Sequence, residues 1–227
     1  MHTETTSSSE PFVLRHLLRI SATFRRRRLV RFLSAFPITS DTRILDVGGG
    51  GHDWDWGEWS GAIPHLTVLN LTVEDGEADG VRYVRGNACD MEQFVDQSFD
   101  IAFSNSVIEH VGSFDNQQRM AAEIRRVARD YWVQTPNRHF PIEPHMCFPF
   151  FQYLPLSWRR VIGRYWPFSF EMLRRGNPER DAVEVRLLDR AEVERCFPEA
   201  RVVPEKAFGL TKSWIATTAV PEPQTAP

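Results

Sequence analysis

The chain has 227 residues, of which 42% are hydrophobic and 25% are charged, and its formal net charge is -3. This length suits one domain with its own core, and the composition excludes a collagen-like or wholly disordered chain. The weakly negative charge gives no overall attraction to nucleic acid or to an anionic membrane surface.

The three cysteines, Cys89, Cys147 and Cys196, lie far apart and form no CxxC pair. We therefore expect reduced thiols in a cytoplasmic protein, without a disulfide framework. Charged residues interrupt the first apolar stretch, residues 12–20, so no secretory signal is expected. No apolar run approaches the roughly 18 residues of a membrane span.

The N-terminal region is expected to be helical after a disordered start. Residues 1–10 are polar and rich in Ser and Thr, which is typical of disorder. Residues 11–40 contain leucines and phenylalanines at helical spacing and predict short helices, with a break near Ser21. The main domain is predicted over residues 41–219, and the Pro-rich residues 220–227 form a tail.

Short apolar runs separated by polar segments predict a parallel sheet covered by helices on both faces. Five such runs are predicted strands: residues 43–47, 66–71, 81–84, 99–104 and 131–134. A helix is predicted over residues 120–128, between the fourth and fifth strands.

An irregular segment follows the fifth strand. Residues 137–180 are dense in Pro and aromatic residues, and we interpret them as an insertion with one or two short helices. Regular structure resumes with a helix over residues 190–196 that Asp189 caps. Two strands, near residues 200–206 and 213–218, complete the domain.

A glycine run directly follows the first strand in the segment Asp46-Val47-Gly48-Gly49-Gly50-Gly51. Glycine permits a positive φ and leaves no Cβ between the backbone and a ligand. A turn of this kind, at the carboxyl end of the first strand, is where nucleotide-like cofactors bind. Asp53 occupies the third glycine position of a dinucleotide fingerprint, which weakens a diphosphate site. Asp46 suits a cofactor with a positively charged amino-acid moiety better, and a simple tight turn is the other interpretation.

The segment Asp46-Val47-Gly48-Gly49-Gly50 resembles the DxGxG motif of class I S-adenosylmethionine-dependent methyltransferases. Gly86-Asn87-Ala88 resembles the family's Gly-Asp-Ala, which follows the third strand and contacts adenine. Residues 99–104 and Val107-Ile108-Glu109-His110-Val111 resemble the fourth strand and the next helix of the small-molecule branch. The resemblance covers roughly residues 43–218.

The resemblance implies an α/β fold with a Rossmann-like, doubly wound sheet of about seven strands, mostly parallel with an antiparallel C-terminal hairpin. It implies S-adenosyl-L-methionine as the cofactor. The implied cofactor-binding residues are Asp46, Gly48, Gly49, Gly50, Asn70, Asn87, Ala88 and Ser104. Asn70 and Asn87 stand where the family usually has a carboxylate, so they forgo the stronger charge-assisted hydrogen bond.

Candidate catalytic residues lie where the acceptor must approach. His110 follows the fourth strand, and Glu143 and His145 lie in the Pro-stiffened segment after the fifth. A histidine or carboxylate can act as the general base for a hydroxyl acceptor, or can hold a loop by hydrogen bonds. No ligand set for a metal is present, and none is expected.

The segment Asn105-Ser106-Val107-Ile108 replaces the Asn/Asp-Pro-Pro-Tyr motif used to methylate planar amino groups. This favours an oxygen, carbon or sulfur acceptor over nitrogen. The aromatic insertion is interpreted as a lid or acceptor pocket, with a self-packed subdomain or a membrane-surface contact as alternatives. The run Arg25-Arg26-Arg27-Arg28 is interpreted as a solvated helix face, because consecutive residues on a helix point in different directions.

The sequence thus predicts methyl transfer to a small-molecule acceptor such as a glycan, lipid or secondary-metabolite intermediate. The main alternative is a protein that binds S-adenosylmethionine without turnover. A nicotinamide-dependent oxidoreductase and an RNA methyltransferase recruited by the arginine run are disfavoured. Neither the acceptor nor the oligomeric state is predicted.

Overall fold

A computed structural model describes residues 12–50, 54, 64–143, 146–166 and 185–219. Its centre is one eight-stranded sheet in the order β3-β4-β2-β1-β5-β6-β10-β9. The strands of this sheet are β1 Arg43–Val47, β2 His65–Asn70, β3 Gly76–Ala78, β4 Val81–Arg85, β5 Phe99–Asn105, β6 Ala128–Pro136, β9 Arg201–Ala207 and β10 Leu210–Thr217. The five central strands run parallel, from β4 to β6, and β10 and β9 continue the sheet as an antiparallel hairpin.

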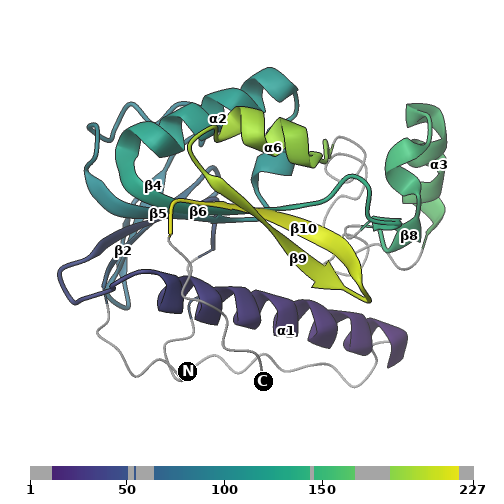
Figure 1. The fold of residues 1–227 in the computed structure, drawn as a ribbon, viewed down its shortest axis with the longest axis horizontal. Coiled ribbons are helices and arrows are strands. Elements are labelled where there is room, and N and C mark those ends of the chain that lie inside the picture. The colour runs from purple at the N-terminus through teal and green to yellow at the C-terminus, as the bar shows by residue number, and fades with distance from the viewer. Residues whose placement is uncertain (1–11, 51–53, 55–63, 144–145, 167–184, 220–227) are drawn as a thin grey trace.

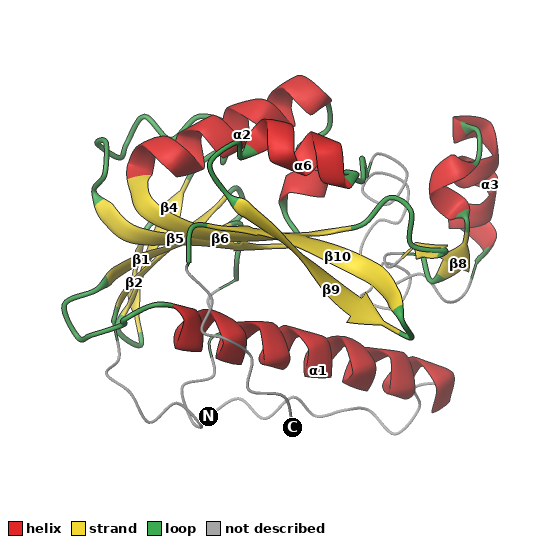
Figure 2. Cartoon of the chain, viewed as in Figure 1, coloured by secondary structure: helices red, strands yellow, loops and turns green. Residues whose placement is uncertain are grey.

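Helices cover both faces of the sheet (Figures 1 and 2). The helices are α1 Phe12–Ala35, α2 Phe114–Val127, α3 Leu156–Tyr165 and α6 Arg190–Cys196, with short 3-10 turns at Ile108–His110 and Phe151–Tyr153. Helix α1 lies along one face, and α2 and α6 lie on the other. This confirms the predicted Rossmann-like architecture, including the antiparallel C-terminal hairpin.

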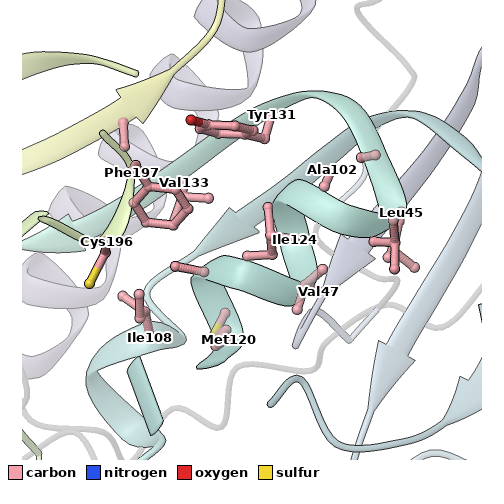
Figure 3. Close-up of a cluster of buried hydrophobic side chains, with 14 of the residues drawn as sticks. Leu45, Val47, Ala102, Ile108, Met120, Ile124, Tyr131, Val133, Cys196 and Phe197 are labelled. Carbon is pink, nitrogen blue, oxygen red and sulfur yellow. The ribbon is translucent and has the colours of Figure 1, made fainter. Parts of the chain in front are cut away.

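Two apolar clusters hold the layers together. The larger joins the sheet to α2 and α6, and Figure 3 shows Leu45 and Val47 of β1 close to Met120 and Ile124 of α2. The second joins the other sheet face to α1, where the Phe32 ring lies 4.8 Å from that of Phe103. Parallel strands that are buried on both faces have short, continuous apolar sequences. These strands could therefore be predicted from the sequence.

The N-terminal region differs from the prediction of two short helices. Helix α1 is continuous from Phe12 to Ala35 and passes through Ser21 without a break. Residues 12–35 contain neither Pro nor Gly, and Ser and Ala are tolerated inside a helix, so nothing in the backbone requires an interruption. Residues 1–10 and 220–227 lie outside the described part of the chain.

Short strands that the sequence does not reveal extend the fold. Strand β3 was not predicted because it is fully exposed and carries no apolar pattern. With β3, the main sheet has eight strands instead of the predicted seven. In the insertion, β7 (Ile142–Glu143) pairs antiparallel with β8 (Phe148–Pro149). The predicted cap of α6 is confirmed, because Asp189 and Glu192 form a reciprocal capping box.

None of the helices within the described ranges combines the length and the apolar character needed to cross a bilayer.

Replacing Ile124 by Ala tests the larger cluster. Ile124 is fully buried, so Ile124→Ala is expected to lower the free energy of unfolding by about 2–5 kcal/mol. The matched control Val95→Ala removes a side chain that is 74% exposed and should change it by less than about 0.5 kcal/mol. Urea titration of both variants measures the difference, and equal effects would contradict this packing.

Candidate functional site

The carboxyl ends of the parallel strands meet at one edge of the sheet, where a cleft of about 610 Å³ opens. Five residues singled out from the sequence line it: Gly48, Asn70, Asn87, Ala88 and His110. Gly86, Val107 and Val111 also line it and belong to the motifs that carry the resemblance, and Leu69 and Leu71 belong to the predicted second strand. Sequence reasoning did not identify the remaining lining residues, which are Cys89, Asp90, Asn116 and Arg119. Asn116 and Arg119 come from the start of α2, and only their helical spacing could have indicated a shared face.

The glycine turn after β1 is compact because its neighbours leave no room for side chains. Gly48 has φ +85°, and its N–H donates to the Leu69 carbonyl at 2.7 Å. A Cβ on Gly48 would lie 2.4 Å from a Val107 methyl, and one on Gly49 would lie 1.8 Å from the Asp46 carboxylate. Both positions therefore require glycine for steric reasons, and Gly48 also for its backbone conformation.

Asp46 lies beneath this turn. Its side chain is buried, and Oδ2 accepts a hydrogen bond from the Trp54 indole N–H at 2.8 Å. The Trp54 ring packs edge-on against Phe32 and Phe103 in the α1 cluster. Trp54 thus belongs to the core. The buried Asp46 carboxyl group thus lies against Gly49 of the turn.

Asn70 fastens the turn from the neighbouring strand. Its Nδ2 donates to the carbonyls of Gly48 and Gly49 at 3.0 and 2.9 Å, and its Oδ1 accepts from Thr72. A carboxylate at this position could not donate those two bonds. The asparagine is therefore explained by the loop that it holds. The cofactor contact expected of Asn70 stays a prediction.

The turn after β4 forms the other wall of the cleft. Asn87 Oδ1 accepts from the Cys89 N–H at 2.9 Å, which shapes the turn that presents Ala88. The Cys89 thiol donates to the Asn116 carbonyl at 3.3 Å. Burial raises the pKa of this thiol, although the charge of Arg119 opposes the rise. Cys89 is therefore a packing group in the cleft wall and not an activated nucleophile.

Ser104 lies behind the lining of the cleft. It is fully buried and donates to the Val47 carbonyl at 3.0 Å, which ties β5 to β1. Glu109 is also fully buried and accepts from the Thr135 hydroxyl at 3.1 Å. Gly50 follows the turn but does not line the cleft. The cofactor contacts expected of Ser104 and Gly50 stay predictions.

Of the predicted acceptor residues, His110 lines the cleft and Glu143 does not. His110 is exposed at the cleft, whereas Glu143 is buried in the insertion and accepts from the Met146 N–H at 2.6 Å. Arg138 pairs with Asp189, and the His139 ring bonds to a tyrosine hydroxyl of the insertion. His145 lies outside the described residues.

A buried ionic cluster lies on the α1 side of the same edge. Arg28 donates from Nε and Nη2 to the Glu205 carboxylate at 2.9 and 2.6 Å, and both side chains are more than 90% buried. Its Nη1 donates to Asn105 and Gln134, which lie near the ends of β5 and β6. The prediction of a solvated arginine face is therefore wrong for Arg28, because that residue turns inward to bind Glu205.

The insertion exposes an apolar surface. Several large side chains of this segment are about half exposed or more: Ile142, Phe150, Tyr153, Leu156, Trp158, Val161 and Tyr165. Beneath them, Phe148, Phe151 and Trp166 pack with Met146 into a small cluster of their own. The described part of the insertion thus packs a small apolar cluster of its own and exposes several apolar side chains.

A second cleft, of about 570 Å³, lies at the opposite edge of the sheet and is lined by the starts of β1, β2 and β5. Arg43 on its wall forms a salt bridge with Asp100. Gly80, in the turn between β3 and β4, lines it, but a Cβ there would meet nothing within 4 Å, in contrast to Gly48. The described residues contain no group of three or more His, Cys, Asp or Glu side chains that could hold a metal ion.

Comparisons with known proteins agree with this geometry. Residues 65–130 match the sequence model of the methyltransferase domain family. The uncharacterized protein Rv1509 of Mycobacterium tuberculosis is 38% identical over 64 residues, which are 28% of this chain and 22% of that protein. The matched segment thus spans about a fifth of the relative's length.

Solved structures share the fold at low sequence identity. Phosphoethanolamine N-methyltransferase 2 of Haemonchus contortus, in complex with phosphomonomethylethanolamine and S-adenosylhomocysteine, matches with a TM-score of 0.51 and 16% identity. That match covers 79% of this chain and 38% of the other. A possible exported protein of Bordetella parapertussis matches with a TM-score of 0.54 and 10% identity over 89% of this chain and 68% of the other.

These likenesses confirm the resemblance to class I methyltransferases of the type 11 branch. The fold is theirs, and the central segment matches their domain family in sequence.

Replacing Gly48 by Ala tests the packing of the turn. Gly80 also has a positive φ, but a Cβ there would meet nothing within 4 Å. Gly80→Ala should therefore cost about 1–2 kcal/mol from backbone strain alone. Gly48→Ala should cost about 1–3 kcal/mol more, because of the clash with Val107. Urea titration compares them, and Val107→Ala should restore part of the Gly48→Ala loss. Equal losses at both glycines would contradict the close approach.

Proposed function

We propose that this chain transfers a methyl group from S-adenosylmethionine to a small-molecule acceptor, at an oxygen or a carbon atom. The observation that carries this proposal is the cleft at the carboxyl edge of the sheet, bounded by the glycine turn and by Ala88. A cleft in this position is where open α/β sheets bind nucleotide-like ligands.

The residues present fit that cofactor. The cleft volume falls within the roughly 300–1,000 Å³ of small-molecule sites. Asp46 places a carboxyl group beside Gly49, and a carboxyl group there suits a positively charged amino-acid moiety. We assign the amino-acid end to Gly48 and Gly49 and the adenine end to the wall formed by Ala88 and Leu71.

When bound, the cofactor supplies a methyl group that is already activated by the sulfonium. The protein then has to hold the acceptor atom in line with the bond between the methyl group and sulfur. His110 lies at the cleft and is the described residue best placed to accept a proton from a hydroxyl acceptor. Glu143 supports the insertion through its bond to Met146, and we assign His145 to the acceptor side.

The insertion supports an apolar or amphiphilic acceptor. Its outer surface carries Trp158, Val161 and Tyr165 in exposed positions on α3. Aromatic and apolar walls are typical of sites for such ligands. Contact of this surface with a membrane stays a prediction.

The alternative, cofactor binding without turnover, relied on Asn70 and Asn87 in the place of carboxylates. Both asparagines have structural partners here, since Asn70 holds the glycine turn and Asn87 shapes the opposite turn. The substitutions are therefore no argument for lost turnover.

Calorimetry with S-adenosylhomocysteine tests cofactor binding. Ala88→Leu extends a side chain into the cleft and should weaken binding at least about tenfold, the equivalent of about 1.4 kcal/mol. Ala78→Leu, on the exposed strand β3, is the matched control and should bind as the parent chain does. If the parent chain binds neither S-adenosylhomocysteine nor S-adenosylmethionine, the proposal fails.

His145→Ala tests the acceptor side. We expect turnover to fall by about a hundredfold, as for loss of a group that positions the acceptor, while the affinity for S-adenosylhomocysteine changes little. Transfer of a labelled methyl group to extract components measures turnover. His65→Ala, at the opposite edge of the sheet, is the control. Unchanged turnover in His145→Ala would remove this residue from the mechanism.

A further inference from the structure

Lys212 lies at the carboxyl edge of the sheet, beside the loop that follows β6. The Asn137 N–H donates to the Lys212 carbonyl at 2.9 Å, and the Asn137 amide donates to the Thr211 carbonyl at 2.8 Å. These two bonds fix the start of β10 against the end of β6. They place Lys212 at the same edge of the sheet as the cleft, outside the set of residues that line it.

The Lys212 side chain is only 19% exposed, and its ammonium group lies in the ionic cluster. Nζ is 4.0 Å from Glu205 Oε2 and 3.8 Å from the centre of the Phe24 ring. Neither contact is a hydrogen bond. The ammonium is thus largely desolvated, yet within the described residues none of its three donors has an acceptor.

The cluster contains more positive than negative charge. Arg28 and Lys212 face the single carboxylate of Glu205, and Arg28 takes both oxygens of that carboxylate at short distance. Burial by itself would raise the pKa of Glu205, but the hydrogen bonds and charge of Arg28 hold it below its ordinary value. Glu205 is therefore ionised and already neutralised by Arg28.

Burial and this excess of positive charge lower the pKa of Lys212. Burial first, and then repulsion from Arg28, lowers its pKa to about 8, and Glu205 only partly offsets the effect. Among the described residues, these two are the charged groups that act on it. A neighbouring donor is also unused: Gln134 Nε2 is buried without a partner, while its Oε1 accepts from Arg28 and Ser106. The cluster has an excess of donors and of positive charge.

We infer that Lys212 binds an oxyanion, a phosphate or carboxylate group carried by the methyl acceptor. The inference rests on the proposed function for the identity of the ligand as an acceptor. The remaining exposure of Lys212 gives access from solvent, and one negative charge would balance the cluster. Asn105 ties the cluster to the cofactor cleft, because it bonds to Arg28 and lies two residues before Val107 of the cleft wall.

Nuclear magnetic resonance of the lysine side chains tests this site directly, because Lys206 and Lys212 are the only two lysines of the chain. Reductive methylation with ¹³C labels both and keeps their charge, and Lys212→Arg assigns the signals. Inorganic phosphate and acetate are added at constant ionic strength, without cofactor. We expect a saturable shift of the Lys212 signal and a rise of its pKa by roughly one unit, because a nearby anion favours the charged form. Lys206 is the internal control.

A Lys212 signal that moves no more than that of Lys206, with either anion, would overturn the inference. Because this readout needs no cofactor, its failure is distinct from failure of the proposed function. If S-adenosylhomocysteine binds in calorimetry but the Lys212 signal does not shift with either anion, only the anion site is rejected. A responsive Lys212 in a chain that binds no cofactor leaves the anion site standing and rejects the methyl-transfer proposal.

Discussion

The close approach of β1, β2 and β5 around the glycine turn is the constraint on which the rest of the site depends. Gly48 and Gly49 have no room for a Cβ, since Val107 and Asp46 occupy that space. Asn70 then binds both glycine carbonyls, and Trp54 binds Asp46 from the core. The turn is therefore held by side chains that are themselves fixed by packing, which makes it a preformed wall for a ligand.

The two faces of the sheet serve this edge in different ways. On the α2 face, apolar packing and the turn at Ala88 shape the cleft that we assign to the cofactor. On the α1 face, Arg28 reaches inward to Glu205, Asn105 and Gln134, and thereby ties helix α1 to three strands of the sheet. The cluster with Lys212 gives this side a positive charge that an acceptor could use.

The sequence predicts those parts whose chemistry is local. The buried strands, the glycine run and the Asp189 cap follow from short-range patterns, and the antiparallel pairing of the last two strands follows from the family resemblance. The continuous helix α1 was missed because propensity alone does not locate a break. Strand β3 was missed because it is exposed and short. The inward turn of Arg28 and the role of Asn70 depend on partners 177 and about 20 residues away, which no local pattern encodes.

The most direct test of the central claim is a crystal structure of the chain soaked with S-adenosylhomocysteine. We predict density in the cleft at the carboxyl edge, with the amino-acid end at Gly48 and Gly49 above Asp46 and the adenine against Ala88. A cleft filled by protein side chains, or the nucleoside bound at the opposite edge near Arg43, would contradict the account.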